Sequence, residues 1–531
     1  MLRKTASKIF FGLPFFLLLL SLSPIAVLVK KSFFTNDVAW EHLKNHSLTS
    51  EIIPNTIFLI FWVVFWSILI AIPCAWIVSR CGFWGRRFFN TALILPMAIP
   101  AYVLAFIYKN FFSFNGFWFS LTGQYKDIFY HNPVTIGFIL SLSLYPYLYL
   151  FLRNAFQSQT VRLLEASQSL GISAQNSFFK IILPISWPWL AVGCLLIILE
   201  TLSDFGAVAI FNYNTFTTSI YKALFDLYSI SSAAKLSLIL VTFCFIVMFG
   251  EKFIRQKKNF NQNKSASKDV SLISLSPAKK TLCFCFCSLI VLISFLIPIM
   301  TLISWALQSK YIVHDILPII YKTFTLAMIG AIVLTIFSLV LYLNSSWASK
   351  KSSLLIRLSM LGYALPGTIL AVALIPPISY LIKISTKISS ISNIAVFITL
   401  ALLIFAYLIR FLLVGYQAIA TQAKRFNKNL LESSTTLGAG RYETIKKIQL
   451  PLIKPGILIA FCLCFVDISK EMPITLMLRP FGWDTLAVKI FELTNDGLWK
   501  ECAIPALLII SLGLIPVYIS SQLSLTAGKE H

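Results

Sequence analysis

The sequence predicts an all-α, polytopic membrane protein with about twelve transmembrane helices in two parallel six-helix repeats. Hydrophobic residues make up 58% of the 531 positions and charged residues only 12%, about half the charged share of globular domains. The apolar residues fall into about twelve runs, and motifs of the first half of the chain recur in the second. This composition excludes a water-soluble enzyme, a disordered chain and a disulfide framework.

The apolar runs are long enough to cross a bilayer, which takes about 20 residues per helix. The first run follows three basic residues, as a cleavable signal would, but it is longer than the apolar core of a signal and lacks a clear cleavage site. We therefore expect it to remain as the first span. The predicted spans are 10–29, 55–79, 88–108, 134–152, 185–203, 236–250, 282–306, 324–343, 354–379, 391–413, 455–476 and 503–521.

The placement of basic residues predicts the orientation of these spans. If the N-terminus lies inside, alternate gaps assign 29 of the 44 Lys and Arg residues to the inner side. A bias of this kind sets topology in the inner membrane. We therefore predict a multi-pass protein of the bacterial inner membrane with both termini in the cytoplasm. The net charge of +24 does not predict a nucleic-acid partner, because the basic residues lie in the gaps between apolar runs.

A cluster of three cysteines raises the question of a metal site. On a helix, the middle cysteine, Cys285, would point away from Cys283 and Cys287, and no histidine lies nearby. We interpret the three as small apolar filler. His42 and His46 are four residues apart in a predicted outer loop but lack a third ligand, so no metal ligand is firmly assigned.

Tyrosines near the end of the fourth span could line a transport path. They are Tyr145, Tyr147 and Tyr149, and they bracket Pro146. Packing between spans and anchoring at the membrane interface are the commoner roles of such residues, and we interpret them in this way.

The chain is predicted to be internally duplicated. Residues 163–188 align without a gap to 430–455 at an offset of 267, and Ala98-Ile99-Pro100 pairs with Ala364-Leu365-Pro366 at an offset of 266. An even number of spans in each half gives both halves the same orientation, so that an axis along the membrane normal relates them. The predicted units are a first half over 1–250, a cytoplasmic linker over 251–281 and a second half over 282–531.

Each half carries a polar stretch between its fourth and fifth spans, at 153–183 and at 414–454. Both stretches show helix-compatible patterning, a central glycine and a Leu-Pro exit into the next span. The central glycine, Gly171 or Gly438, favours a break with positive φ, which predicts a helix–turn–helix elbow on the cytoplasmic surface. Because the elbows lack catalytic side chains, we interpret both as docking surfaces.

The two elbows resemble the cytoplasmic coupling loops of type I ABC importer permeases. The resemblance rests on a glutamate, a central glycine and an Ile-x-Leu-Pro exit at fixed spacing, although serine occupies the third position of both copies. It implies that each loop docks in a groove of a separate ATPase subunit, so that two such subunits are partners. The motif residues are Glu165, Ala166, Ser167, Gly171, Ile181, Leu183 and Pro184 in the first copy, and Glu432, Ser433, Ser434, Gly438, Ile448, Leu450 and Pro451 in the second.

The sequence contains no phosphate-binding loop of the form G-x-x-x-x-G-K-[ST], so ATP hydrolysis is expected in a separate chain. We predict a transport subunit that is not an enzyme and binds no cofactor. An ion-coupled secondary transporter is an alternative, since that class also has twelve spans in two parallel halves, but it leaves the twin elbows unexplained. A membrane-embedded enzyme would require a nucleophile or paired His and Asp residues.

Acidic residues at or near membrane depth follow the fifth span of each half. Glu200 and Asp204 share a helix face, and Asp467 and Glu471 are their equivalents at an offset of 267. Burying a carboxylate in a bilayer costs about 2.5–3.5 kcal/mol on insertion scales, which predicts a role for them. The first hypothesis is a ring of hard oxygen ligands, or an electrostatic guide, for a cation on a translocation path. The second places them at the outer rim, where they pair with Lys470 or contact a binding protein.

The segments around these acidic residues are similar to fused ferric-iron ABC permeases. The similar segments are 203–208 and 216–221 in the first half, and 467–473, 478–481 and 484–487 in the second. The resemblance implies an iron(III) importer that receives its cargo from a periplasmic substrate-binding protein. Fused permeases for thiamine and related small molecules share the architecture, so these substrates remain an alternative.

Overall fold

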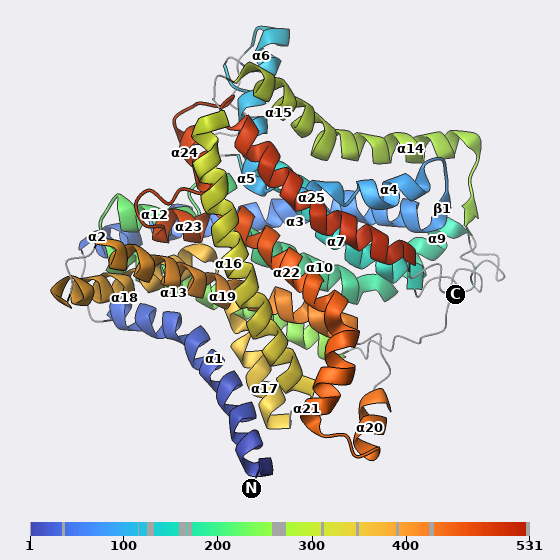
Figure 1. Cartoon of the computed structure of the whole chain (residues 1–531). Coiled ribbons are helices and arrows are strands. Elements are labelled where there is room, and N and C mark those ends of the chain that lie inside the picture. The colour runs from blue at the N-terminus through green and yellow to red at the C-terminus, as the bar shows by residue number, and fades with distance from the viewer. Residues whose placement is uncertain are drawn as a thin grey trace.

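The structure, a computed structural model, is almost entirely helical (Figure 1). It describes residues 2–33, 38–114, 116–124, 132–158, 167, 173–257, 272–309, 313–346, 350–388, 392–423 and 429–526. Short segments labelled η are 3-10 or π-helical turns that join or extend the α-helices.

The first half of the chain supplies the elements up to residue 257. They are α1 (Leu2–Phe33), α2 (Val38–Leu43), η1 (Lys44–Ile52), α3 (Ile53–Arg80), β1 (Cys81–Gly82), α4 (Arg86–Ala92), η2 (Leu95–Ala98), α5 (Ala101–Phe111), α6 (Phe117–Thr122), α7 (Pro133–Ser158), α9 (Ala174–Ser177), η3 (Phe178–Ile182), α10 (Leu183–Ser203), α11 (Gly206–Ile210), α12 (Phe216–Phe225) and α13 (Ile230–Lys257).

The second half supplies the elements from residue 273 onward. They are β2 (Ile273–Ser274), α14 (Pro277–Val291), η4 (Leu292–Leu296), α15 (Ile297–Gln308), α16 (Val313–Ser346), α17 (Lys350–Ser359), η5 (Leu361–Ala364), α18 (Gly367–Ile388), α19 (Ser392–Ala423), α20 (Asn429–Thr436), α21 (Arg441–Thr444), η6 (Ile445–Gln449), α22 (Leu450–Lys470), α23 (Pro473–Leu478), α24 (Leu486–Asn495) and α25 (Ala503–Thr526).

The number of membrane helices agrees with the prediction. In the described part of the chain, ten helices are long and apolar enough to cross a membrane, and the bent pair formed by α4–η2 and α5 raises the number to eleven. The shorter apolar helix Ala503–Ile515, at the start of α25, is the candidate for one more span. The all-α fold class with about twelve spans is therefore confirmed.

The third predicted span, over 88–108, is sharply bent in the structure. The axes of the helical segments 86–98 and 101–111 differ by 87°. The break follows Ile99, whose φ of −89° and ψ of 117° are extended. The second half breaks at the equivalent Leu365, with φ of −82° and ψ of 119°. Both residues precede a proline, which disfavours helical backbone in the residue before it.

The duplication is visible in matching elements. The segment η3–α10 begins at Phe178 and its counterpart η6–α22 at Ile445, an offset of 267. Within the predicted linker over 251–281, residues 251–257 continue α13, and residues 277–281 begin α14. Between them, β2 pairs in parallel with β1, with Ile273 opposite Cys81. Residues 258–271 lie outside the described part, and the domain boundaries stay a prediction.

The three cysteines near the start of the second half are arranged as helical geometry predicts. Cys285 is exposed, whereas Cys287 is buried and Cys283 is half-buried. Cys287 belongs to a core that also contains Cys74 and Val78 of α3. Two of the three cysteines thus face the packed side of α14, and the middle one faces away from it.

Each half contributes helices to both hydrophobic cores. The first core combines α3, α5 and α7 with residues of α14 and α15, such as Val291 and Leu302. The second combines residues of α1, such as Leu17 and Leu28, with α13 and with α16, α18 and α19. In keeping with this, α1 packs against α17 and α18 of the other half. The two halves of the sequence are therefore interwoven in space.

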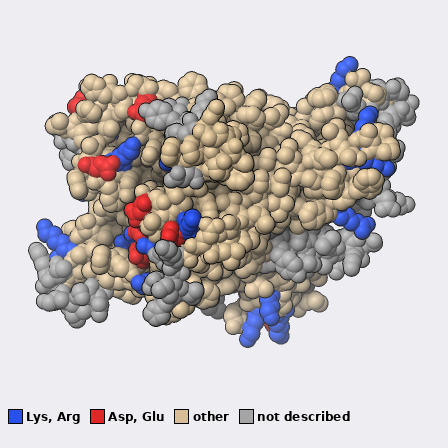
Figure 2. All heavy atoms as spheres, turned by 90° about the horizontal axis from the view of Figure 1, so that it is seen from above, with Lys and Arg blue, Asp and Glu red and all other residues tan. Residues whose placement is uncertain are grey.

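The two sides of the helical bundle differ in charge. The beginning of α1 and the helices α20 and α21 lie at the lower edge of Figure 1, and β1 and α9 lie to the right. The connecting helices α2, α6, α12 and α24 lie toward the left and top. Seen from above, acidic side chains gather toward the left together with basic ones, whereas the right edge shows Lys and Arg (Figure 2).

The interwoven cores predict how a divided chain behaves. If the chain is cut between Lys264 and Ser265, neither half expressed alone should fold, because each would expose the apolar surface that the other covers. Co-expressed halves should assemble into a complex with the stability of the intact chain. Fluorescence-detected size-exclusion chromatography in detergent measures this, with the uncut chain as control. A sharp monomeric peak from either half alone would contradict interweaving.

Candidate functional site: a charged cavity between the halves

A cavity of about 440 Å³ lies between the two halves of the chain. Its walls come from α5, α7, α10 and α11 of the first half and from η5, α19, α22 and α23 of the second. All four acidic residues singled out in the sequence line it: Glu200, Asp204, Asp467 and Glu471. The structure thus brings them together with Lys470 in one cavity, and their roles stay predictions.

Two of the four carboxylates cap short helices inside the protein. The backbone N–H groups of Ala207 and Val208 donate to Asp204 Oδ1 at 3.0 and 3.3 Å, at the start of α11. At the equivalent place in the second half, the N–H groups of Ile474 and Thr475 donate to the carboxylate of Glu471, both at 3.1 Å. Each carboxylate satisfies N–H groups that the first turn of a helix leaves unpaired.

The other two carboxylates lie one helical turn earlier, on α10 and α22, and make no such cap. Glu200 Oε1 accepts a hydrogen bond of 3.2 Å from the hydroxyl of Tyr363, which belongs to the other half. The equivalent Asp467 lines the same cavity, as does Tyr147 of α7. These two carboxylates and two phenols form a set of oxygen groups that face one another across the boundary between the halves.

The cavity also holds basic groups, Lys470 and Arg410. Lys470 Nζ donates to the carbonyl oxygen of Met97 in the first half, at 3.5 Å. Arg410 Nη1 is buried without a hydrogen-bond partner among the described residues. A Cβ on Gly367 would lie 2.8 Å from Arg410 Nη1 and 2.9 Å from Glu471 Oε1, so both side chains approach the bare glycine backbone.

Sequence reasoning missed part of this site. Arg410 lies near the end of the predicted tenth span, 391–413, and the sequence analysis does not single it out. In the structure, α19 continues to Ala423 and places Arg410 in the cavity. Tyr363 was not singled out at all. Tyr147 lines the cavity, contrary to the packing interpretation, whereas Tyr145 and Tyr149 are buried in the core as expected.

The elbow of the second half adopts the predicted shape. Helices α20 and α21 are separated by a turn in which Gly438 has φ of +81°, a conformation that favours glycine. The exit residues Ile448, Leu450 and Pro451 form the junction of η6 with α22, as Ile181, Leu183 and Pro184 do for η3 and α10. Glu165, Ala166, Gly171 and the side chain of Glu432 lie outside the described residues, so the docking role stays a prediction.

The structure gives a reason for the serine at the third motif position. The hydroxyl of Ser167 lies 2.7 Å from that of Ser177, and the hydroxyl of Ser434 lies 3.1 Å from that of Thr444. All four side chains are buried, and the two pairs are related by the offset of 267. In both elbows, a buried hydrogen bond therefore ties the motif to the short helix that follows the turn.

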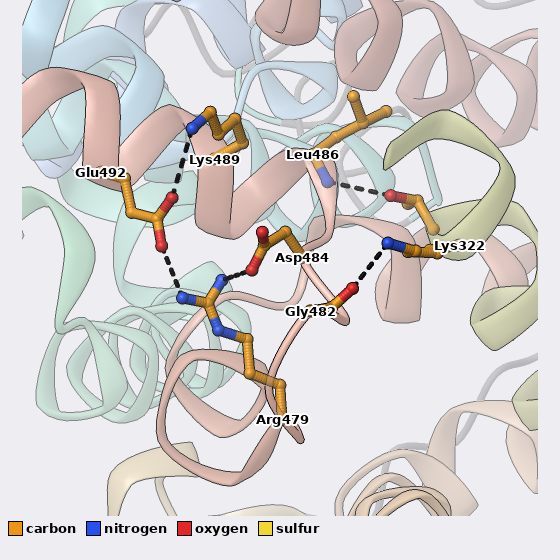
Figure 3. Close-up of polar contacts among 8 residues, drawn as sticks. Lys322, Arg479, Gly482, Asp484, Leu486, Lys489 and Glu492 are labelled. Atoms are coloured by element: carbon orange, nitrogen blue, oxygen red, sulfur yellow. Dashed lines mark hydrogen bonds and ion pairs between the residues drawn. The ribbon is translucent and has the colours of Figure 1, made fainter. Parts of the chain in front are cut away.

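Ion pairs fix a loop between α23 and α24 (Figure 3). Arg479 Nη1 pairs with Asp484 at 2.6 Å, and its Nη2 pairs with Glu492 at 2.5 Å. Lys322 Nζ donates to the carbonyl of Gly482 at 2.6 Å, which ties the loop to α16. The loop extends directly from α23, whose first residue lines the cavity, so its position is coupled to that of the cavity wall.

Comparison with known proteins places these features in a family. Residues 67–259 match the family described as binding-protein-dependent transport system inner membrane component. The chain is 30% identical to the Fe(3+)-transport system permease protein FbpB 2 of Haemophilus influenzae over 481 residues, which is 88% of this chain and 89% of that protein. It is 28% identical to the molybdenum transport system permease protein ModB of Escherichia coli over 34% of this chain and 83% of that protein. It is 29% identical to the sulfate transport system permease protein CysT of Salmonella typhimurium over 25% and 48%.

The different hydrogen bonding of the four carboxylates predicts different effects of substitution. Asp204→Ala and Glu471→Ala should each lower the free energy of unfolding by about 1 kcal/mol, since each leaves capped N–H groups unpaired. Glu200→Gln and Asp467→Asn should leave it nearly unchanged, because neither side chain caps a helix. Thermal unfolding in detergent, followed by tryptophan fluorescence, measures the difference. Equal changes in unfolding temperature for all four variants would show that the two capping carboxylates contribute no more to stability than the other two.

Proposed function

This chain belongs to the family of binding-protein-dependent transport system inner-membrane components, the permeases of ABC transporters, and on this premise we propose that it carries ferric iron across the inner membrane. It is a multi-pass inner-membrane permease subunit that works with a substrate-binding protein and with ATPase subunits. Family membership removes the secondary transporter as an alternative. In the proposed arrangement, both termini are cytoplasmic and two ATPase subunits bind, one at each elbow.

The charge distribution supports this orientation. The elements β1 and α9 belong to segments that are predicted to lie on the inner side of the membrane. They lie toward the edge that shows Lys and Arg in Figure 2. Acidic side chains gather toward the opposite end. Basic residues are enriched on the cytoplasmic side of inner-membrane proteins, so the elbows face the compartment that holds the ATPases.

The chemistry of the cavity is the observation that supports iron as the cargo. Glu200 and Asp467 offer carboxylates that are not used in helix capping, and Tyr147 and Tyr363 offer phenols beside them. Oxygen donors of this kind suit hard cations, including ferric iron. The relative that matches nearly the whole chain is a permease for Fe(3+), which agrees with this chemistry.

A second candidate cargo is an oxyanion. Lys470 and Arg410 place two positive charges in the same cavity, and the shorter matches include permeases for molybdenum and sulfate. The composition of the lining opposes this candidate, because four acidic residues stand against two basic ones.

The geometry supports a mechanism in which a single rigid helix joins each elbow to the cavity. Helix α22 begins at Leu450, beside the elbow, and ends at Lys470 in the cavity. Its 21 residues span about 30 Å at 1.5 Å per residue. Helix α10 makes the same connection in the first half. When ATP closes the ATPase subunits, the elbows move together, and both helices carry that displacement to the carboxylates.

Hydrolysis of ATP in proteoliposomes tests the cargo. We expect the complex of permease and ATPase to be stimulated several-fold more by iron-loaded binding protein than by the same protein without iron, because only the loaded form presents cargo to the cavity. Binding protein from an unrelated system is the control. Equal stimulation by loaded and empty forms would remove iron from the proposal, and selective stimulation in a molybdate-loaded system would favour the oxyanion.

The turn of the second elbow provides a test of coupling. Gly438→Val should lower uptake strongly, because a β-branched residue at positive φ forces the turn to change, at a cost of about 1–2 kcal/mol or more. Gly438→Asn should retain most activity, since asparagine tolerates this conformation. Gly440→Val is a matched control, because Gly440 is exposed, has no positive φ and has open space around it.

Uptake of radioactive iron and recovery of the ATPase with the tagged permease are measured together for these variants. The coupling role predicts that Gly438→Val removes most of the uptake although the purified permease stays folded, with a thermal transition lowered only by the strain in the turn. If Gly440→Val were as harmful as Gly438→Val, the geometry of the turn would not matter for coupling.

A further inference from the structure

Lys470 is the feature of the cavity that the proposed transport of a cation leaves unexplained. A lysine in a site for a positively charged cargo repels that cargo. Yet it lines the same cavity as the four carboxylates, with Asp467 one helical turn earlier on the same helix. Its backbone carbonyl accepts a hydrogen bond from the hydroxyl of Tyr102, at 3.4 Å, so its position is also fixed from the first half.

The protein provides a dedicated space for this side chain. Lys470 extends from the end of α22 to the carbonyl oxygen of Met97 in the first half. On the way it lies across Gly513 of α25, where a Cβ would be 2.7 Å from Nζ and 2.8 Å from Cε. Any larger residue at position 513 would displace the ammonium group. The fold therefore holds the lysine side chain in a defined position.

The duplication shows that this lysine is a difference between the halves. The equivalent position at an offset of 267 is Ser203, which also lines the cavity. The first half thus contributes Glu200 and Asp204 without a base at this place, whereas the second half contributes its two acids with Lys470. The caps and the helix ends are otherwise matched, so the lysine is an addition to a symmetric frame.

Physical chemistry suggests what such a charge does. A cavity with four carboxylates attracts a multivalent cation strongly, and a site on a transport path must bind weakly enough for the cargo to leave. A fixed positive charge a few ångströms away weakens binding of the cation and supplies a counter-charge when the cavity is empty. It also lowers the cost of burying carboxylates that have no cargo.

We propose that Lys470 is a resident counter-cation that keeps the carboxylate cavity from trapping its multivalent cation cargo. Between transport cycles, its ammonium group balances Asp467 and the neighbouring carboxylates. When cargo enters, the lysine competes with it and so speeds its release. This inference rests on the proposed transport of ferric iron, and it assigns Lys470 as a residue that tunes affinity.

Three variants test the charge separately from the fold. Lys470→Met removes the charge but keeps a long side chain. The paired change Lys470→Ser with Ser203→Lys moves the lysine to the first half, at the matched position of the repeat. Lys279→Met is a matched control outside the cavity, because Lys279 is exposed at the start of α14. All are made in the full chain and purified with the ATPase subunits, and size-exclusion profiles show which complexes are intact.

The readout is the amount of radioactive iron that each complex retains after incubation with ferric citrate and rapid desalting, together with the rate of uptake in proteoliposomes. Lys470→Met should retain about tenfold more iron and take it up more slowly, because a cation is bound more tightly without the nearby charge. The relocated lysine should bring retention back toward the wild-type value. The Lys279→Met complex should resemble the wild type.

The outcomes separate this inference from the proposed function. If intact Lys470→Met complexes retain no more iron than the wild type, Lys470 does not tune affinity, whether or not iron is transported. Retention that stays high after the lysine is relocated would also overturn the inference. If the wild type carries molybdate and not iron, and Lys470→Met loses molybdate binding, the proposed function and the inference both fail, because the lysine is then a ligand.

Discussion

The structure depends on one constraint, that backbone N–H groups inside a membrane protein must find partners away from water. Each half ends a long helix in the interior and starts a short one three residues later, which leaves N–H groups unpaired. Asp204 and Glu471 accept these hydrogen bonds. Because the caps are carboxylates, the broken helices bring negative charge to the boundary between the halves. The requirement of the fold thereby creates the charged lining of the cavity.

The interwoven halves determine how motion can pass through this frame. Helix α1 packs on α17 and α18 of the other half, and both cores contain helices from both halves. Neither half can therefore move as a separate body. The hydroxyl pairs in the elbows, Ser167 with Ser177 and Ser434 with Thr444, make the elbows stiff at the points where the long helices begin. Helices α10 and α22 begin close to these pairs and end at the cavity.

Much of this architecture could be predicted from the sequence because it depends on local patterns. Apolar runs indicated the spans, the spacing of Gly438 indicated the turn, and the repeat paired the four acidic residues. The rest depends on contacts between distant residues. Nothing near Tyr363 in the sequence indicates that its hydroxyl reaches Glu200 of the other half. Arg410 was not recognised because periodicity does not distinguish a charge in a cavity from one at a span end. The roles of the elbow and cavity residues stay predictions.

In a duplicated permease, the matched positions show what both halves need, and the unmatched positions show what the cargo needs. Paired caps, broken third spans and elbows recur, since each serves the frame. Lys470 occupies the position that Ser203 occupies in the first half, and Tyr363 takes the place of Met97 at the offset of 266. The loop fixed by Arg479 is also unmatched, because the offset rises from 267 at the start of α23 to 270 at the start of α24. The two halves therefore line their boundary with different side chains, although the frame that positions these side chains is repeated.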